Sequence, residues 1–223
     1  DYNDENRFYI NYEKCDHNNL FWRTDFKLIP GRIYFCKNEI SNAKSILKKA
    51  NIFWSKKTEI KHRGIIFFYS YFIKQNNEFY TYKMKNKNWG EKNWIKLIDR
   101  LKDKYLIIQS VHEKAKKIDG VFYSENEFDF RTACAVLNNC DIYLGNEGGF
   151  GHVAAALNKK ALIYFGGWIS PQSTGYAMHE NIYYDDLNSP CGAVGYLCDH
   201  CNKARESITV EYLEEKVKLK IKK

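Results

Sequence analysis

The sequence is poor in proline, with 3 among 223 residues, and it has no apolar run long enough to span a membrane. Its longest apolar stretch, Gly64 to Ile73, has the length of a strand, whereas a membrane-spanning helix needs about 20 apolar residues. Disorder is also excluded, because hydrophobic residues make up 44% of the chain and charged residues 28%. The chain begins at Asp1 with neither a methionine nor an apolar leader, so we expect no signal peptide and a start inside a longer protein.

Several motifs of well-known active sites are missing as well. The sequence has no Gly-x-Gly-x-x-Gly fingerprint in the right register and no phosphate-binding loop that ends in Gly-Lys-Ser/Thr. It also has no Gly-x-Ser-x-Gly nucleophile elbow and no serine, histidine and aspartate at a recognisable triad spacing. These absences give no support to dinucleotide-dependent, P-loop or serine-hydrolase chemistry.

The net charge is +8, and such a basic balance can attract nucleic acid, an anionic membrane surface or phosphorylated ligands. The lysines are spread along the chain rather than grouped in a tail, which favours a solvated lysine-rich surface. Aromatic and basic residues interleave over residues 67–87, but these aromatics fit a buried strand better than a nucleic-acid surface. We therefore expect no nucleic-acid partner.

Seven cysteines are present, which is an odd number, and the first four are scattered. Without a leader sequence, this favours reduced thiols in a cytoplasmic protein over a disulfide framework. Cys198 and Cys201 have metal-ligand spacing, and with Cys191 and a histidine, either His200 or His179, they could hold a structural zinc ion. A second such pair is absent, so free thiols are favoured and no metal site is predicted.

Strand and helix patterns alternate from residue 32 to residue 220. Apolar runs predict strands at 32–36, 64–72, 105–109, 120–123, 141–144, 161–165 and 181–184. Helical spacing predicts helices at 39–50, around 94–101, around 130–137, at 152–157 and from Thr209 onward. The alternation predicts an α/β fold: a Rossmann-like parallel sheet with helices on both faces, which binds ligands at the carboxyl ends of its strands.

Residues 141–152, Asp-Ile-Tyr-Leu-Gly-Asn-Glu-Gly-Gly-Phe-Gly-His, run from a predicted strand through a glycine-rich turn into a predicted helix. Glycines let the backbone approach a ligand, and a helix start offers free N–H groups, so a diphosphate is a natural ligand. Glu147 would repel phosphates and suits a ribose or sugar hydroxyl, while His152 could donate to a phosphate oxygen. On the turn alone, the stronger alternative is a tight strand-to-helix connection that needs glycine for its geometry.

The longer segment from Asp129 to Gly167 resembles the family 9 glycosyltransferases, the heptosyltransferase-like enzymes of bacterial surface polysaccharide synthesis. Their pattern runs as helix, Ala-Asp, strand, Gly-Asn-Asp-Ser-Gly-x-x-His, Ala-Ala-Ala-Leu-Gly, strand and Phe-Gly. Upstream, Lys87-Asn-Trp-Gly-Glu-Lys-Asn-Trp94 is similar to the family's Lys-x-Trp-Pro-x-x-x-Trp, which opens the first helix of the donor domain. Residues 31–50 and 191–218 are similar to the family's interdomain segment and C-terminus.

The resemblance implies the C-terminal half of a GT-B fold, in which two Rossmann-like domains enclose the active site. We accordingly expect residues 1–37 to be a linker or remnant preceding the domain, and residues 38–223 to form a nucleotide-sugar-binding Rossmann-like domain. The family's catalytic base is an aspartate of the acceptor domain, which would precede Asp1, so no catalytic residue is assigned. The resemblance also implies an inverting reaction that uses no metal and no cofactor.

Position by position, the resemblance assigns donor binding to Lys87, Glu147, Gly148, Gly149 and His152. Lys87 matches a lysine that contacts the donor phosphates, and Gly149 and His152 match the family's glycine and histidine. Glu147 stands where the family has aspartate, and Gly148 stands where it has serine. These two departures leave the donor base and sugar open.

The loop after residue 167 adds candidates, because it follows a strand end on the ligand side. Ser170 and Thr174 are expected to line the donor site, and Trp168 could stack on a base or a sugar. The alternative for each of these residues is an ordinary role in a loop. The alternative for Lys87 is that it is one more lysine on the surface.

The sequence therefore predicts a glycosyltransferase that moves a sugar from a nucleoside-diphosphate donor to a saccharide or lipid-linked saccharide acceptor. The process is expected to be surface polysaccharide or lipopolysaccharide synthesis in bacteria. The alternative is a non-catalytic module that binds a nucleotide or a glycan. We expect a cytoplasmic protein, and peripheral association with the inner face of the membrane stays open.

Overall fold

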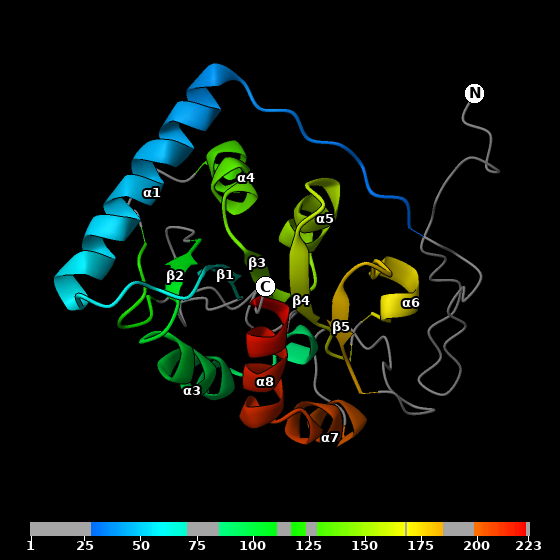
Figure 1. Cartoon of the computed structure of the whole chain (residues 1–223). Helices are drawn as coiled ribbons and strands as arrows, with labels where there is room; N and C mark the ends of the chain where they lie inside the picture. The colour runs from blue at the N-terminus through cyan, green and yellow to red at the C-terminus, as the bar shows by residue number, and fades with distance from the viewer. Residues whose placement is uncertain are drawn as a thin grey trace, which may run out of the picture.

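The chain folds around one parallel β-sheet (Figure 1), seen in a computed structural model that describes residues 28–70, 85–110, 117–123, 129–167, 169–184 and 199–221. The strands in these residues are β1 (Ile65–Tyr69), β2 (Leu106–Gln109), β3 (Ile142–Asn146), β4 (Lys160–Tyr164) and β5 (Glu180–Ile182). Their spatial order is β2-β1-β3-β4-β5, and every neighbouring pair is parallel.

Helices cover both faces of this sheet (Figure 1). They are α1 (Lys37–Lys57), α3 (Glu91–Leu101), α4 (Phe130–Asn138), α5 (Gly149–Ala156), α6 (Pro171–Thr174), α7 (Asp199–Ser207) and α8 (Val210–Ile221), with a 3-10 turn, η2 (Lys85–Lys87). Helices α1, α4 and α5 pack on one face, and α3 and α8 pack on the other. Among the described residues, no helix combines the length and apolarity that crossing a membrane requires.

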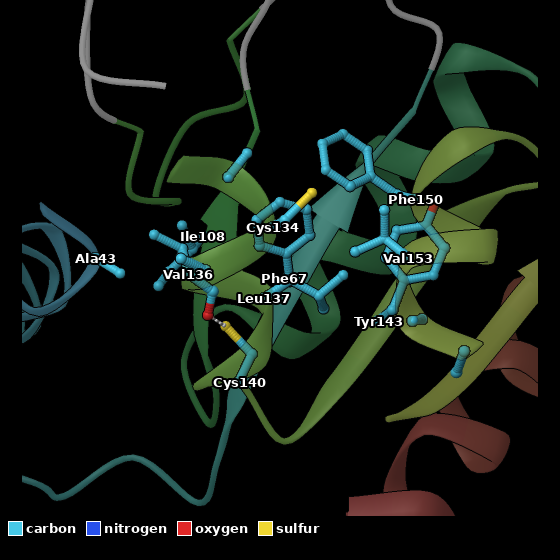
Figure 2. Close-up of a cluster of buried hydrophobic side chains, with 14 of the residues drawn as sticks. Ala43, Phe67, Ile108, Cys134, Val136, Leu137, Cys140, Tyr143, Phe150 and Val153 are labelled. Carbon is cyan, nitrogen blue, oxygen red and sulfur yellow. Dashed lines mark hydrogen bonds between the residues drawn. The ribbon is translucent and has the colours of Figure 1, made fainter. Parts of the chain in front are cut away.

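The strands feed two hydrophobic cores, one on each face. Phe67 of β1 belongs to the core under α1, α4 and α5, whereas its neighbours Ile66 and Phe68 belong to the core under α3 and α8. This division follows from the pleat, which turns successive side chains of a strand to opposite faces. Figure 2 shows the first core, in which the rings of Phe67 and Phe150 have centroids 5.1 Å apart.

The predicted fold class, an α/β Rossmann-like parallel sheet covered on both faces, is confirmed. The helix predicted around 94–101 is confirmed as α3, and the residues that fall at helical spacing in it are fully buried: Trp94, Leu97, Ile98 and Leu101. The first helix is longer than predicted, since α1 runs from Lys37 to Lys57. The division of the chain at residues 37 and 38 stays a prediction, and residues 1–27 lie outside the described part.

Two predicted strands are wrong. Residues 32–36 are extended but join no sheet, because their backbone groups bond elsewhere: the Tyr34 carbonyl accepts from Arg131, and the Cys36 N–H donates to Glu39 at 2.7 Å. Residues 120–123 make only an isolated bridge, from Phe122 to Ile108 of β2. Apolar composition over a few residues therefore predicted strands at two places where the chain forms none, because composition does not supply a pairing partner.

The strand order reverses direction between β1 and β3. The chain leaves β1 for β2 on one side and leaves β3 for β4 on the other side, so the two connections diverge. In open α/β sheets, a crevice forms beyond the carboxyl ends of two such strands. Ser70 follows β1 and Glu147 follows β3, so these residues mark where a site is expected.

Candidate functional site

Lys87 is held by backbone contacts beside the carboxyl ends of β3 and β4. The Gly167 N–H, just past β4, donates to the carbonyl oxygen of Asn86 at 2.8 Å, and the Asn146 side chain donates to the carbonyl oxygen of Lys87 at 2.6 Å. Gly166 allows this approach, because an added Cβ would lie 1.8 Å from the Asn86 carbonyl oxygen. The η2 turn is therefore fixed against the end of the sheet.

Asn146 also joins the two diverging strands. Its side-chain oxygen accepts a hydrogen bond of 2.9 Å from the hydroxyl of Ser70, beyond β1. Both side chains are buried, where polar groups need partners. Because the Asn146 amide also reaches the Lys87 carbonyl, one buried side chain links β1, β3 and η2 into a single frame.

The Lys87 ammonium forms an ion pair with the Glu147 carboxylate, and each side chain is 8% exposed. Burial lowers the pKa of Lys87 from its ordinary value, and the charge of Glu147 opposes that shift. Removing one partner of a buried pair leaves the other charge uncompensated, at a cost of about 3–5 kcal/mol. A cation and an anion are therefore fixed side by side beyond the carboxyl end of β3.

The N-terminus of α5 begins two residues after Glu147. Gly148 caps it with a φ of 145°, which glycine adopts without the strain that a side chain would add. The first amides of a helix lack intrahelical acceptors and carry a partial positive charge. An added Cβ at Gly149 would meet no described atom within 4 Å, so open space adjoins these amides. Such a place suits a phosphate group.

His152 lies at the end of the first turn of α5, and its Nδ1 is 2.9 Å from the hydroxyl of Tyr176. Tyr176 packs edge-on against His179 as well, with ring centroids 5.5 Å apart. Burial lowers the pKa of His152, and it lowers the pKa of His179 to about 4. Both imidazoles are therefore neutral at pH 7.

Ser170 and Thr174 lie on a separate element, α6, after the carboxyl end of β4. Ser170 caps this helix, since its hydroxyl accepts from the Gln172 N–H at 3.2 Å. The Thr174 hydroxyl oxygen is buried and has no partner among the described residues. The structure thus gathers part of the predicted donor site around the start of α5, namely Lys87, Glu147, Gly148, Gly149 and His152, and gives Ser170 and Thr174 local surroundings in α6.

Some predicted features lie outside the described residues. These are Trp168, Cys191, Cys198 and the side chains of His200 and Cys201, so the zinc alternative stays untested. Within the part of the chain that is described, no group of three His, Cys, Asp or Glu side chains could hold a metal ion. The cysteines there are free thiols, namely Cys36, Cys134 and Cys140.

Comparison with protein families covers the segment that contains this site. The model described as "Glycosyltransferase family 9 (heptosyltransferase)" matches residues 79–192, which is just over half of the chain. The chain belongs to glycosyltransferase family 9. Both the Lys87 turn and the glycine-rich turn fall inside the matched segment. A search of curated protein sequences gave no match.

Two solved structures share the fold of this family 9 chain. The ADP-heptose lipopolysaccharide heptosyltransferase II of E. coli gives a TM-score of 0.54 at 17% identity, over 85% of this chain and 53% of that one. A family 9 glycosyl transferase of Veillonella parvula gives 0.54 at 15% identity, over 87% of this chain and 55% of that one. This chain therefore spans about half the length of either structure, and the likeness shows the fold, half of a GT-B architecture.

Sequence reasoning missed four residues that hold this family 9 site together. Asn146 ends β3 and Ser70 directly follows β1, and a polar residue at the end of a buried strand is a signal that could have identified them. Gly166 follows a strand too, but the reason why this position cannot hold a side chain appears only when η2 is packed against it. Tyr176 carries no signal in the sequence, because its contact with His152 spans 24 residues.

Proposed function

We propose that this chain is the donor-binding half of a glycosyltransferase, which transfers a sugar from a nucleoside-diphosphate sugar to a saccharide or lipid-linked saccharide acceptor. The process we propose is assembly of bacterial surface polysaccharide or lipopolysaccharide. One observation carries this proposal: the buried Lys87–Glu147 pair stands directly before the open N-terminus of α5, in a family 9 chain. The reaction would take place on the cytoplasmic side, with peripheral contact at the inner face of the membrane.

The donor diphosphate would bind across Lys87 and the first amides of α5. An ammonium has three N–H donors, so Lys87 can keep its contact with Glu147 and still donate to a phosphate oxygen. Glu147 would accept a hydrogen bond from a ribose or sugar hydroxyl, because a carboxylate repels phosphates and binds only groups that donate hydrogen bonds. Gly148 and Gly149 would let the backbone approach the phosphates closely.

The same groups would assist the bond-breaking step. When the bond from the anomeric carbon to the phosphate oxygen breaks, negative charge grows on the departing diphosphate. The Lys87 charge and the amides of Gly149 and Phe150 are fixed before the reaction, and such preorganised groups stabilise developing charge. We propose on this basis that no divalent cation is needed, and that an acceptor oxygen attacks from the opposite face with inversion. No group described in this chain is assigned as the base that takes the acceptor proton.

Ser170 and Thr174 stay candidates for the donor site. The buried Thr174 hydroxyl has no partner among the described residues, and that makes it the stronger of the two. Ser170 already serves α6 as its cap, so a ligand contact would have to compete with the Gln172 amide.

Calorimetry with Lys87→Ala tests the donor site. Purified chain is first screened by thermal shift against ADP-, GDP-, UDP- and CDP-sugars, because a ligand that binds the folded state raises its apparent stability. For the best nucleotide, Lys87→Ala should weaken binding at least tenfold, since a hydrogen bond to a charged group contributes about 1.5–3 kcal/mol. Unchanged affinity would remove Lys87 from the site.

Two further variants separate binding from folding. Lys96→Ala removes an exposed lysine from the neighbouring helix α3 and should leave affinity unchanged. Lys87→Met combined with Glu147→Gln removes both charges and leaves no buried carboxylate unpaired. If this double variant melts like the parent chain and still binds poorly, lost folding is not the cause.

Transfer is tested with radiolabelled sugar on the nucleotide that binds best, in the presence of EDTA, with surface polysaccharide extract as acceptor. EDTA-sensitive transfer would contradict metal independence. A donor-binding half on its own is expected to bind nucleotide without transfer, so the non-catalytic module is favoured only if no transfer occurs when an acceptor domain is also present.

A further inference from the structure

Tyr176 contacts a predicted donor-binding residue from outside the glycine-rich turn. Its hydroxyl lies 2.9 Å from Nδ1 of His152, and the two rings meet edge-on at 80° with centroids 5.6 Å apart. Tyr176 is buried, whereas His152 is partly open to solvent although part of its ring is covered. Within the described residues, Nε2 of His152 has no protein partner. The tyrosine therefore engages one ring nitrogen and leaves the other to a ligand.

Tyr176 is itself held in place by the segment that leads into β5. Its carbonyl oxygen accepts from the N–H of His179 at 3.0 Å and from the side-chain amide of Asn181 at 3.1 Å. Its ring packs against that of His179, which is 7% exposed. Because burial holds the pKa of His179 at about 4, this ring is neutral at pH 7 and places no charge beside Tyr176.

The direction of the Tyr176–His152 hydrogen bond decides which nitrogen of His152 carries the proton. A neutral imidazole has one N–H and one acceptor nitrogen. If Tyr176 donates, Nδ1 is the acceptor and Nε2 carries the proton. If Tyr176 accepts, its own O–H needs another acceptor, and the described residues offer none. Since a buried tyrosine hydroxyl usually finds a partner, donation by Tyr176 is favoured.

We propose that Tyr176 is a positioning residue that keeps the proton of His152 on Nε2, where it donates to a phosphate oxygen of the bound donor. The phosphate part of this inference rests on the proposed function, but the tautomer itself needs no ligand. With the opposite tautomer, the lone pair of Nε2 would face the phosphate oxygens and repel them. A contact made outside the glycine-rich turn thus sets the chemistry of a residue inside it.

The tautomer is measured first, without any nucleotide. Long-range ¹H–¹⁵N spectra of histidine-labelled chain are recorded at pH 7.5, and the His152 signals are assigned by their loss in His152→Gln. We expect an acceptor-type Nδ1 and a protonated Nε2, and we expect Tyr176→Phe to shift His152 toward a mixture of tautomers. Protonation on Nδ1 in the parent chain, or no change in Tyr176→Phe, would overturn the proposal.

A double-mutant cycle with ADP then separates positioning from structural support. The Gln side chain carries its N–H group near the place of Nε2 and has no tautomers, so His152→Gln removes the need for Tyr176. Tyr176→Phe should weaken ADP binding roughly two- to tenfold in the parent chain, as expected for one lost hydrogen bond, and little in the His152→Gln background. Equal losses in both backgrounds would mean that Tyr176 only supports the fold.

The two failures are distinguishable. If the spectra show the expected tautomer but the parent chain binds none of ADP, GDP, UDP, CDP and inorganic pyrophosphate, the donor site is wrong and the phosphate role of His152 falls with it. If ADP binds but the spectra show Nδ1–H, the donor site stands and the role of Tyr176 is wrong.

Discussion

Gly166→Ala should displace Lys87 without touching any proposed ligand contact directly. In the native chain the η2 turn lies against the end of β4, and a Cβ at position 166 would stand 1.8 Å from the Asn86 carbonyl oxygen and 2.9 Å from Cα of Lys87. Both atoms belong to backbone, so no side-chain rotation can relieve the overlap. The turn must therefore move away from the sheet.

The size of the effect follows from these distances. Non-bonded heavy atoms are most stable at about 3.5–4 Å, so the turn must shift by on the order of 1 Å or more. This movement strains two hydrogen bonds, from Gly167 to Asn86 at 2.8 Å and from Asn146 to Lys87 at 2.6 Å. Overpacking of this kind costs about 1–3 kcal/mol of stability. Because the Lys87 ammonium moves with its backbone, nucleotide affinity should fall at least tenfold.

Two other glycines give matched controls for this substitution. Urea unfolding and calorimetry with the best nucleotide are measured for each variant. Gly31→Ala meets no described atom within 4 Å and should change neither quantity. Gly149→Ala also meets none, but its Cβ enters the space proposed for the phosphates, so it should weaken binding and spare stability. If Gly166→Ala binds and unfolds like the parent chain, the packing of η2 on β4 is not what positions Lys87.

Two further predictions concern stability. His179 has a pKa of about 4 in the folded chain against an ordinary 6.5, so the unfolded state binds more protons between these values. The free energy of unfolding should therefore fall by at most about 3 kcal/mol as the pH drops from 6.5 toward 4. In His179→Asn it should fall by less over the same range, when the parent chain and the variant are both followed by urea unfolding. Asp129→Ala removes the cap of α4, where the carboxylate accepts from the Thr132 N–H at 2.7 Å, and should cost about 0.5–2 kcal/mol in urea. The exposed control Glu59→Ala should cost under about 0.5 kcal/mol, and an equal loss in both variants would contradict the cap.

Local pattern was enough to predict most elements of the fold but not their arrangement. The apolar runs of β1 and β3 and the spacing in α3 are properties of short windows, so the sequence shows them directly. The order β2-β1-β3-β4-β5 depends on pairings between distant segments, and no window contains them. The short helix α6 was missed for a related reason, because four residues are too few to display a helical period.

In the candidate site too, the sequence predicted individual residues but not the contacts between them. The family motif drew attention to Lys87 and Glu147 separately, but a motif names residue types rather than partners. Their ion pair arises because η2 is packed on the end of β4 and Asn146 holds it there. The partners that a motif leaves out, such as Tyr176, come from segments whose sequence is unremarkable.

The sequence resemblance predicts two departures from the family pattern, Glu147 for aspartate and Gly148 for serine, and the structure shows what each residue does in this chain. Gly148 has a φ of 145°, where any side chain would add strain of about 1–3 kcal/mol, so this backbone conformation favours glycine over serine. The Glu147 carboxylate reaches the Lys87 ammonium from the same turn, and an aspartate there would end one methylene shorter. Without a serine hydroxyl, the turn can offer a ligand only backbone amides and the neighbouring charges. Under the proposed function, those groups would bind the diphosphate that every nucleoside-diphosphate sugar contains, so the screen for the donor must extend across bases and sugars alike.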